Sequence, residues 1–295
     1  MKVFYDDAYA GAAYAFETTR KAKWVADSLA VAPIGGIVLE APLSLTWEQL
    51  TEVHDPVYAR AIQTGEPRAL AQSQEFTWDA GLWPMVLASN GGMVAAALEA
   101  LRSGVSGSLS SGLHHARRSR GAGYCTFNGL AIAARQALAA GAKSVLILDL
   151  DAHAGGGTAE LIADQADIWQ FDVSVDPYDR YQPGPRAWLE VVDRADDYLP
   201  RIEAGLARME LLAPRFDLCL YNAGMDASER CGDGGLAGIT QDVLTAREKF
   251  VFDWCAQRAL PVAFALAGGY IGAQLDQHAL VALHRLTLHA AASSS

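Results

Sequence analysis

The sequence is poor in cysteine, which bears on both its redox chemistry and its location. Its 295 residues include four cysteines, and no two of them have the CxxC spacing that is typical of zinc ribbons and thioredoxin-like motifs. Small secreted domains held together by disulfides are much denser in cysteine. We therefore expect reduced thiols and a cytoplasmic location.

Positive charge and long apolar runs are also scarce. There are 23 lysines and arginines against 34 acidic residues, which gives a net charge of −11. Proteins that bind nucleic acids cluster Lys and Arg to neutralise phosphates, so this balance argues against a nucleic-acid partner. We find no apolar run long enough to span a bilayer and no signal-peptide core near the N-terminus, and we expect no membrane association.

What the sequence does contain is a regular alternation of apolar strands and helices. We expect strands over residues 2–5, 37–39, 105–109, 145–149, 167–175, 216–221 and 261–267. We expect helices over residues 17–29, 93–102, 128–140, 196–213, 240–258 and 272–291. Such alternation is typical of an α/β fold in which helices cover both faces of one parallel sheet. The length suits a single domain over residues 1–295, with residues 286–295 as a loosely attached tail.

The most informative segment runs from Val145 to His153. Four apolar residues, typical of a buried parallel strand, lead directly into Asp149, Asp151 and His153. Side chains alternate on an extended chain, so these three polar side chains should point the same way. An unpaired buried carboxylate is strongly destabilising, and a shared metal ion would explain two carboxylates beside one imidazole. A salt-bridged structural cluster is the alternative.

Three further strand candidates end in reactive side chains. They lead to the pair His114-His115, to Asp226 and to Tyr270. In open α/β sheets, ligands bind beyond the carboxyl ends of the strands, so these residues should meet the aspartates and histidine of the first segment in one crevice. Each has a simpler explanation when it is taken alone: a histidine pair at a surface, an aspartate in an ordinary loop, and a tyrosine packed on a turn.

Five motifs together resemble the zinc-dependent histone deacetylases, and they occur in the order found in that family. The motifs are SGLHHA (Ser111–Ala116), GAGYC (Gly121–Cys125), LDLDAH (Leu148–His153), YNAGMDA (Tyr221–Ala227) and LAGGY (Leu266–Tyr270). The resemblance extends from about residue 1 to about residue 285 and implies the arginase/deacetylase fold. The GLHH and YNAGMD motifs and a segment from Phe16 to Lys21 are most similar to the class IV group.

The resemblance implies a metal centre. Asp151, His153 and Asp226 would ligate a zinc ion and leave open positions for water and substrate. Two carboxylates and one imidazole would also accept iron(II). In the family, the positions of Asp149, Asp151 and Ser174 also belong to a monovalent-cation site, so a potassium ion could bind there.

The resemblance also implies the catalytic groups. His115 would be the general base that takes a proton from the attacking water and returns it to the leaving amine. His114, oriented by Asp149, would be its electrostatic partner. Tyr270 would donate a hydrogen bond to the oxyanion, and Tyr124 would line a narrow tunnel for an acyl-lysine stem.

One position departs from the family. Many members carry Asp or Asn three residues after the metal-binding histidine, and this residue supports the second histidine of the pair. Here the position is Gly156. His115 should therefore be less basic, differently oriented or supported from elsewhere. This puts a high turnover in doubt, but it does not affect the prediction of the metal site.

The implied function is a metal-dependent amidohydrolase that removes an acyl group from an N-acyl-lysine or a related N-acyl amine. The substrate stays open between an acetyl-lysine peptide, a longer fatty acyl-lysine, an acetylated polyamine and another small amide. A catalytically silent acyl-lysine-binding protein is an alternative of another class, and the complete set of ligands, histidines and tyrosine argues against it. An arginase-like ureohydrolase would need acidic residues for a second metal where this chain has Gly155 and Ser228.

Overall fold

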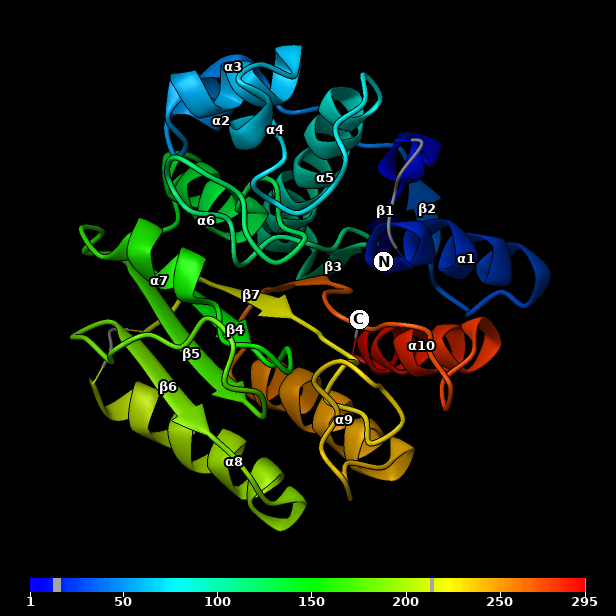
Figure 1. Cartoon of the computed structure of the whole chain (residues 1–295). Coiled ribbons are helices and arrows are strands. Elements are labelled where there is room, and N and C mark those ends of the chain that lie inside the picture. The colour runs from blue at the N-terminus through cyan, green and yellow to red at the C-terminus, as the bar shows by residue number, and fades with distance from the viewer. Residues whose placement is uncertain (13–16, 213–214, 295) are drawn as a thin grey trace.

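An eight-stranded parallel sheet forms the centre of the chain in the computed structural model, which describes residues 1–12, 17–212 and 215–294 (Figure 1). Across the sheet the strands are β2 (Val38–Glu40), β1 (Lys2–Phe4), β3 (Val105–Ser108), β8 (Val262–Ala265), β7 (Leu218–Asn222), β4 (Val145–Asp149), β5 (Ile168–Ser174) and β6 (Ala187–Val191). Every neighbouring pair is parallel, which confirms the predicted α/β fold. The predictions that concern Phe16, residue 213 and Ser295 lie outside the described residues.

Helices connect these strands and cover the sheet. They are α1 (Glu17–Val31), α2 (Trp47–Thr51), α3 (Pro56–Thr64), α4 (Arg68–Ala71), α5 (Leu82–Ser103), α6 (Gly129–Ala139), α7 (Gly156–Ile162), α8 (Ala195–Leu212), α9 (Gln241–Gln257) and α10 (Gln277–Ser293), with a 3-10 helix at Asp7–Ala10. The sequence analysis misses α3, although Asp55 caps it and Pro56 opens it. It also misses β6, because the half-buried side chains of this edge strand form no apolar run.

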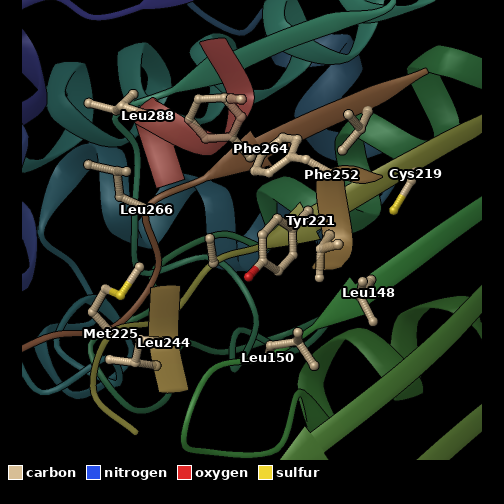
Figure 2. Packing of buried hydrophobic residues seen from close by; sticks show 14 of the residues in the cluster. Leu148, Leu150, Cys219, Tyr221, Met225, Leu244, Phe252, Phe264, Leu266 and Leu288 are labelled. Carbon is tan, nitrogen blue, oxygen red and sulfur yellow. The ribbon is translucent and has the colours of Figure 1, made fainter. Parts of the chain in front are cut away.

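The central strands are buried along their whole length, because alternate side chains face two layers of helices. Val145 and Ile147 of β4 pack in a cluster with α5 and α6 on one face. Leu146 and Leu148 pack with α8, α9 and α10 on the other, and Figure 2 shows part of this second cluster. Apolar packing on both faces of a parallel sheet holds the strand ends in fixed positions at one edge.

Helix α5 begins at Leu82 and not at Met93, where the sequence analysis places the helix start after two glycines. These glycines, Gly91 and Gly92, lie inside the helix and are buried. A Cβ atom added to Gly91 would lie 2.2 Å from the carbonyl oxygen of Leu43. Glycine therefore serves here to let a neighbouring backbone segment approach the helix, and it does not interrupt the helix.

By length and composition, α5 could also cross a bilayer, which corrects our expectation that no apolar run is long enough. The helix packs against β3, β8 and α6, and most of its residues are buried. Its place in the core therefore accounts for its apolar composition.

The C-terminal segment is a packed helix, which corrects the expectation of a loose tail over residues 286–295. Helix α10 continues to Ser293, and Leu288 and Ala291 on it are fully buried. The two side chains are three residues apart and share a face of the helix, and α10 packs against α1 and α9. The small, polar residues of the last turns conceal this periodicity in the sequence.

The four strands that lead to the predicted site are consecutive neighbours, in the order β3, β8, β7 and β4. Their register places Ser108, Ala265, Asn222 and Asp149 at one level of the sheet. Because all the strands are parallel, the loops that follow these residues leave the same edge. The expected convergence of the strand ends is confirmed.

We predict that Gly91→Ala destabilises the protein even though alanine is the better helix former. The added methyl group would push the Leu43 backbone away, and such overpacking lowers the free energy of unfolding by about 1–3 kcal/mol. Urea or thermal unfolding measures the change. Gly35→Ala is the matched control, since an added Cβ there meets no atom within 4 Å, and it should change stability by less than about 0.5 kcal/mol. Equal stability of the two variants would contradict the packing role of Gly91.

Candidate active site

The predicted metal ligands lie together at the ends of two neighbouring strands. Strand β4 ends at Asp149, and Asp151 and His153 follow in a bend of the chain. Asp226 follows β7, and all four side chains are buried. Asp149 is not part of the ligand group, because its carboxylate pairs with His114.

Asp151, His153 and Asp226 form a compact group whose potential ligand atoms all lie within 4.8 Å of one another. Nδ1 of His153 is 3.2 Å from Oδ1 of Asp151 and 3.3 Å from Oδ2 of Asp226. Backbone amides hold the other carboxylate oxygens: Gly268 donates to Oδ2 of Asp151 at 2.7 Å, and Ala152 donates to Oδ1 of Asp226 at 2.9 Å. The fold thus directs both carboxylates toward one imidazole nitrogen.

The charges of this group fit a divalent cation. Burial, followed by the charge on Asp151, raises the pKa of Asp226. Burial also opposes ionisation of Asp151, but His114 and His153 hold its pKa well below the usual range. Oδ2 of Asp226 is buried and accepts no hydrogen bond from the described residues. A cation would compensate this oxygen and the second carboxylate beside it, and this donor set suits zinc or iron(II).

The histidine pair carries two different protonation states. The ring centroids of His114 and His115 are 3.9 Å apart. Burial lowers the pKa of His114, but Asp149, 2.8 Å from its Nδ1, and Asp151 outweigh burial and raise this pKa to about 10. Burial, followed by the charge on His114, lowers the pKa of His115 to about 4. At neutral pH, His114 is therefore charged and His115 is a neutral base.

Asp179 and Tyr178 belong to the site, and the sequence analysis misses both. Nδ1 of His115 lies 2.9 Å from Oδ2 of Asp179, and the Tyr178 ring centroid lies 4.9 Å from that of His115. Both residues follow β5, the strand next to β4, so a fifth strand end contributes to the site. The signal that could have found them is the sequence DPYD, from Asp176, directly after an apolar strand.

Aromatic rings form the walls of a cavity of about 250 Å³ that reaches the metal-ligand group at His153. His115 and His153 lie in its lining, with Tyr124, Tyr178 and Tyr270 around them. The backbone of Tyr124 has a φ of 62°, in the left-handed region that few side chains adopt. Strain of this kind is maintained at sites where a side chain must be aimed, and here it places the ring in the cavity wall.

Tyr270 keeps its phenolic proton. Burial, followed by the charges of Asp226 and Asp151, raises its pKa well above the ordinary value. Nζ of Lys21, on α1, donates a hydrogen bond to the carbonyl oxygen of Ala267 and so ties down the LAGGY segment that carries Tyr270. The Lys21 side chain is fully buried, and burial lowers its pKa to about 8 against the attraction of the two aspartates.

The rim of the cavity is acidic. Glu75, Asp176 and Asp233 line it, and none of its described lining residues is a lysine or an arginine. Oδ1 of Asp233 lies 3.9 Å from Nε2 of His153, and the Asp233 side chain is more than half exposed. The opening therefore presents negative charge to an approaching molecule.

The residues expected to bind a monovalent cation lie around one turn of the backbone. Oγ of Ser174 donates to the carbonyl oxygen of Ala152 at 2.8 Å and lies 2.7 Å from that of Asp176. The amide of Asp151 donates to Oδ1 of Asp149 at 3.2 Å. A potassium site formed by Asp149, Asp151 and Ser174 stays a prediction.

Comparison with known proteins supports the resemblance seen in the motifs. The histone deacetylase domain matches residues 15–195. An uncharacterized protein of Picosynechococcus is 33% identical over 252 residues, which cover 83% of this chain and 81% of that protein. Histone deacetylase 2 of Arabidopsis thaliana is 30% identical over 191 residues, which cover 61% of this chain and 48% of that protein. The crystal structure of an acetylpolyamine aminohydrolase from Burkholderia pseudomallei has the same fold, with a TM-score of 0.81, 19% identity, and coverage of 100% of this chain and 99% of that one.

We predict that Asp226→Asn weakens the binding of a divalent metal by more than the roughly 10- to 100-fold that is lost when a residue supporting a ligand is changed, because a neutral amide replaces a charged ligand. Metal content per chain after loading with zinc or iron(II), measured by plasma mass spectrometry, tests this. Asp233→Asn makes the same chemical change at the rim and should keep the wild-type stoichiometry. Full metal content in Asp226→Asn would contradict the ligand set.

Proposed function

The chain belongs to the histone deacetylase domain family of hydrolytic enzymes, and on this premise we propose that it removes an acyl group from an N-acyl amine with one divalent metal ion. The observation that supports this most directly is the meeting of three groups at one cavity: the metal-ligand group, a histidine pair with one neutral member, and a protonated tyrosine. Amide hydrolysis needs a nucleophile, a base and an oxyanion donor, and the cavity offers a candidate for each.

The ion would be held by Asp151, His153 and Asp226, and we propose zinc, with iron(II) as the alternative. Bound there, it would lower the pKa of a water molecule and polarise the amide carbonyl. Backbone donors fix both carboxylates before any ligand arrives, so the site is preorganised. A potassium site formed by Asp149, Asp151 and Ser174 remains part of the proposal.

His115 is the residue to which we assign proton transfer. It is neutral at physiological pH, so it can take a proton from the attacking water and return it to the leaving amine. His114, held by Asp149, would keep positive charge next to His115. Tyr270 keeps its proton and can donate a hydrogen bond to that oxyanion.

The aromatic walls fit the alkyl stem of an acylated amine. Tyr124 and Tyr178 line the cavity together with Tyr270, and an extended methylene chain can pack between such rings. A charged head group would then remain at the rim, while the amide reaches the metal-ligand group. This arrangement suits a substrate with a linear stem, such as an acyl-lysine or an acylated polyamine.

The acidic rim favours a substrate with positive charge on the amine side. Glu75, Asp176 and Asp233 would attract cations and raise their local concentration. We therefore favour an acetylated polyamine or an acyl-lysine flanked by basic residues over a neutral amide. The rim would contact the amine side of the substrate and would select for positive charge there. It does not determine the length of the acyl group, so a fatty acyl-lysine remains an alternative.

A cytoplasmic location is also part of the proposal. All four cysteines are free and buried, which agrees with a reducing compartment. The buried thiols have no role in the proposed reaction.

We predict that Tyr270→Phe keeps one metal per chain but lowers kcat by roughly 10²- to 10³-fold, the usual effect of losing one oxyanion donor. KM should change little, because the ring still lines the cavity. Single-turnover and steady-state kinetics measure the effect. Tyr178→Phe removes a hydroxyl from another wall of the same cavity and should leave kcat within a few-fold of wild type. Wild-type rates for Tyr270→Phe would remove its proposed role.

A panel of acylated amines tests the activity and the substrate together. It contains acetylated diamines and polyamines, acetyl-lysine peptides with basic or acidic flanks, and myristoyl-lysine peptides, each with and without a chelator. We expect chelator-sensitive turnover that is fastest for the cationic substrates. Absence of turnover on every substrate, with metal bound at one ion per chain, would favour the silent acyl-lysine-binding alternative.

The rim is tested with the same panel. Asp233→Asn should raise KM for the cationic substrates by about 1.5- to 5-fold, as expected for one exposed charge pair, and should leave neutral substrates unchanged. Added salt should have the same selective effect. An equal loss on charged and neutral substrates would contradict charge selection.

A further inference from the structure

We propose that Asp179 is the positioning residue of His115 and replaces the support that Gly156 cannot give. The inference rests on the proposed function, because it assigns a partner to the general base. Nδ1 of His115 donates to Oδ2 of Asp179 at 2.9 Å. A proton held on Nδ1 leaves Nε2 as the basic nitrogen, which is the tautomer that a general base needs.

The Asp179 carboxylate is itself held from two further directions. The amide of Gly157 donates to its Oδ2 at 3.2 Å, and Nη2 of Arg117 donates to its Oδ1. Arg117 also binds the carbonyl oxygen of Gly156 at 3.3 Å and Oε2 of Glu160 at 2.7 Å. The Asp179 side chain is only 7% exposed, so little water competes with these bonds. It is therefore a fixed hydrogen-bond acceptor.

The backbone of Asp179 shows that this position is maintained by its contacts. Its φ is 55°, in the left-handed region that disfavours residues other than glycine. Such conformations persist where surrounding contacts determine them, and they gather at functional sites. Here the bonds to His115, Gly157 and Arg117 supply those contacts.

Asp179 in its present position leaves no room for a side chain at position 156. A Cβ atom added to Gly156 would lie 2.3 Å from the Asp179 carbonyl oxygen and 2.5 Å from its Oδ1. The carboxylate that follows β5 thus fills the space that a side chain on α7 would occupy. A larger residue at position 156 would displace Asp179, so the glycine and the aspartate form one compensating pair. Asp179 therefore gives His115 the support that Gly156 cannot give, while burial and the charge on His114 still lower the pKa of His115.

The test compares Asp179→Ala and Asp179→Asn with Glu160→Gln in the metal-loaded full chain. Glu160 is the matched control, because it is a carboxylate held by the same arginine but does not touch His115. We expect both Asp179 variants to lower kcat by about 10- to 100-fold, part of the 10²- to 10⁴-fold contribution of a general base, with KM and metal content unchanged. Glu160→Gln should keep the wild-type kcat. Gly156→Ala should reproduce the loss seen in the Asp179 variants.

Nitrogen-15 NMR of the histidine rings adds a reading that a merely structural role would not change. In wild type, the His115 signal, assigned by its loss in His115→Gln, should report a proton on Nδ1. In Asp179→Ala it should show a larger fraction of the tautomer with the proton on Nε2. If Asp179→Ala fails to fold, Gly156→Ala serves in this measurement, because its added methyl group displaces the Asp179 carboxylate.

The outcomes separate the two proposals. Wild-type kcat and an unchanged tautomer in both Asp179 variants would overturn the role of Asp179 and leave the proposed hydrolase function standing. Absence of turnover in wild type would overturn the proposed function, and the tautomer measurement would still test the contact between Asp179 and His115. A loss of kcat in the Asp179 variants without any change of tautomer would also overturn the positioning role.

Discussion

Two buried carboxylates that face the same imidazole nitrogen are the constraint on which the site depends. Asp151 and Asp226 repel each other, and burial removes the water that would otherwise screen them. The fold reduces this repulsion with backbone amides from Ala152 and Gly268 and with the imidazole of His153. One oxygen of Asp226 still lacks a hydrogen-bond donor among the described residues. The strand ends therefore hold a concentration of negative charge that a divalent ion can neutralise.

The same negative charge helps to shift the pKa values of the two histidines in opposite directions. His114 lies next to Asp149 and Asp151, which raise its pKa, whereas His115 lies next to the charged His114, which lowers its own. Their ring centroids are only 3.9 Å apart, yet their protonation preferences are opposite. A charged residue and a neutral base therefore result from position relative to the carboxylates, since the two side chains are chemically identical.

The sequence allowed the parallel fold to be predicted, because strands and helices leave local patterns. The apolar run that ends in Asp151 and His153 predicts a shared metal ion in the same way, whereas Asp226 joined the ligand group only through the resemblance carried by the YNAGMDA motif. Asp179 and Tyr178 could not be found in this way, because their importance comes from the loop after β5 folding over α7. Gly91 was misread for a similar reason: a glycine that precedes a helix and one that lets a neighbouring backbone approach a helix look the same in a sequence.

The segment that follows β8 also links the site to the folding of the whole sheet. The Gly268 amide holds Asp151, and the Ala267 carbonyl accepts a hydrogen bond from Lys21 on α1. These bonds join residues that lie 117 and 246 positions apart in the chain. Contacts between such distant segments form late in folding, because long loops must close first. A partly folded chain in which β8 has not yet joined the sheet would therefore expose Asp151 without its backbone donor.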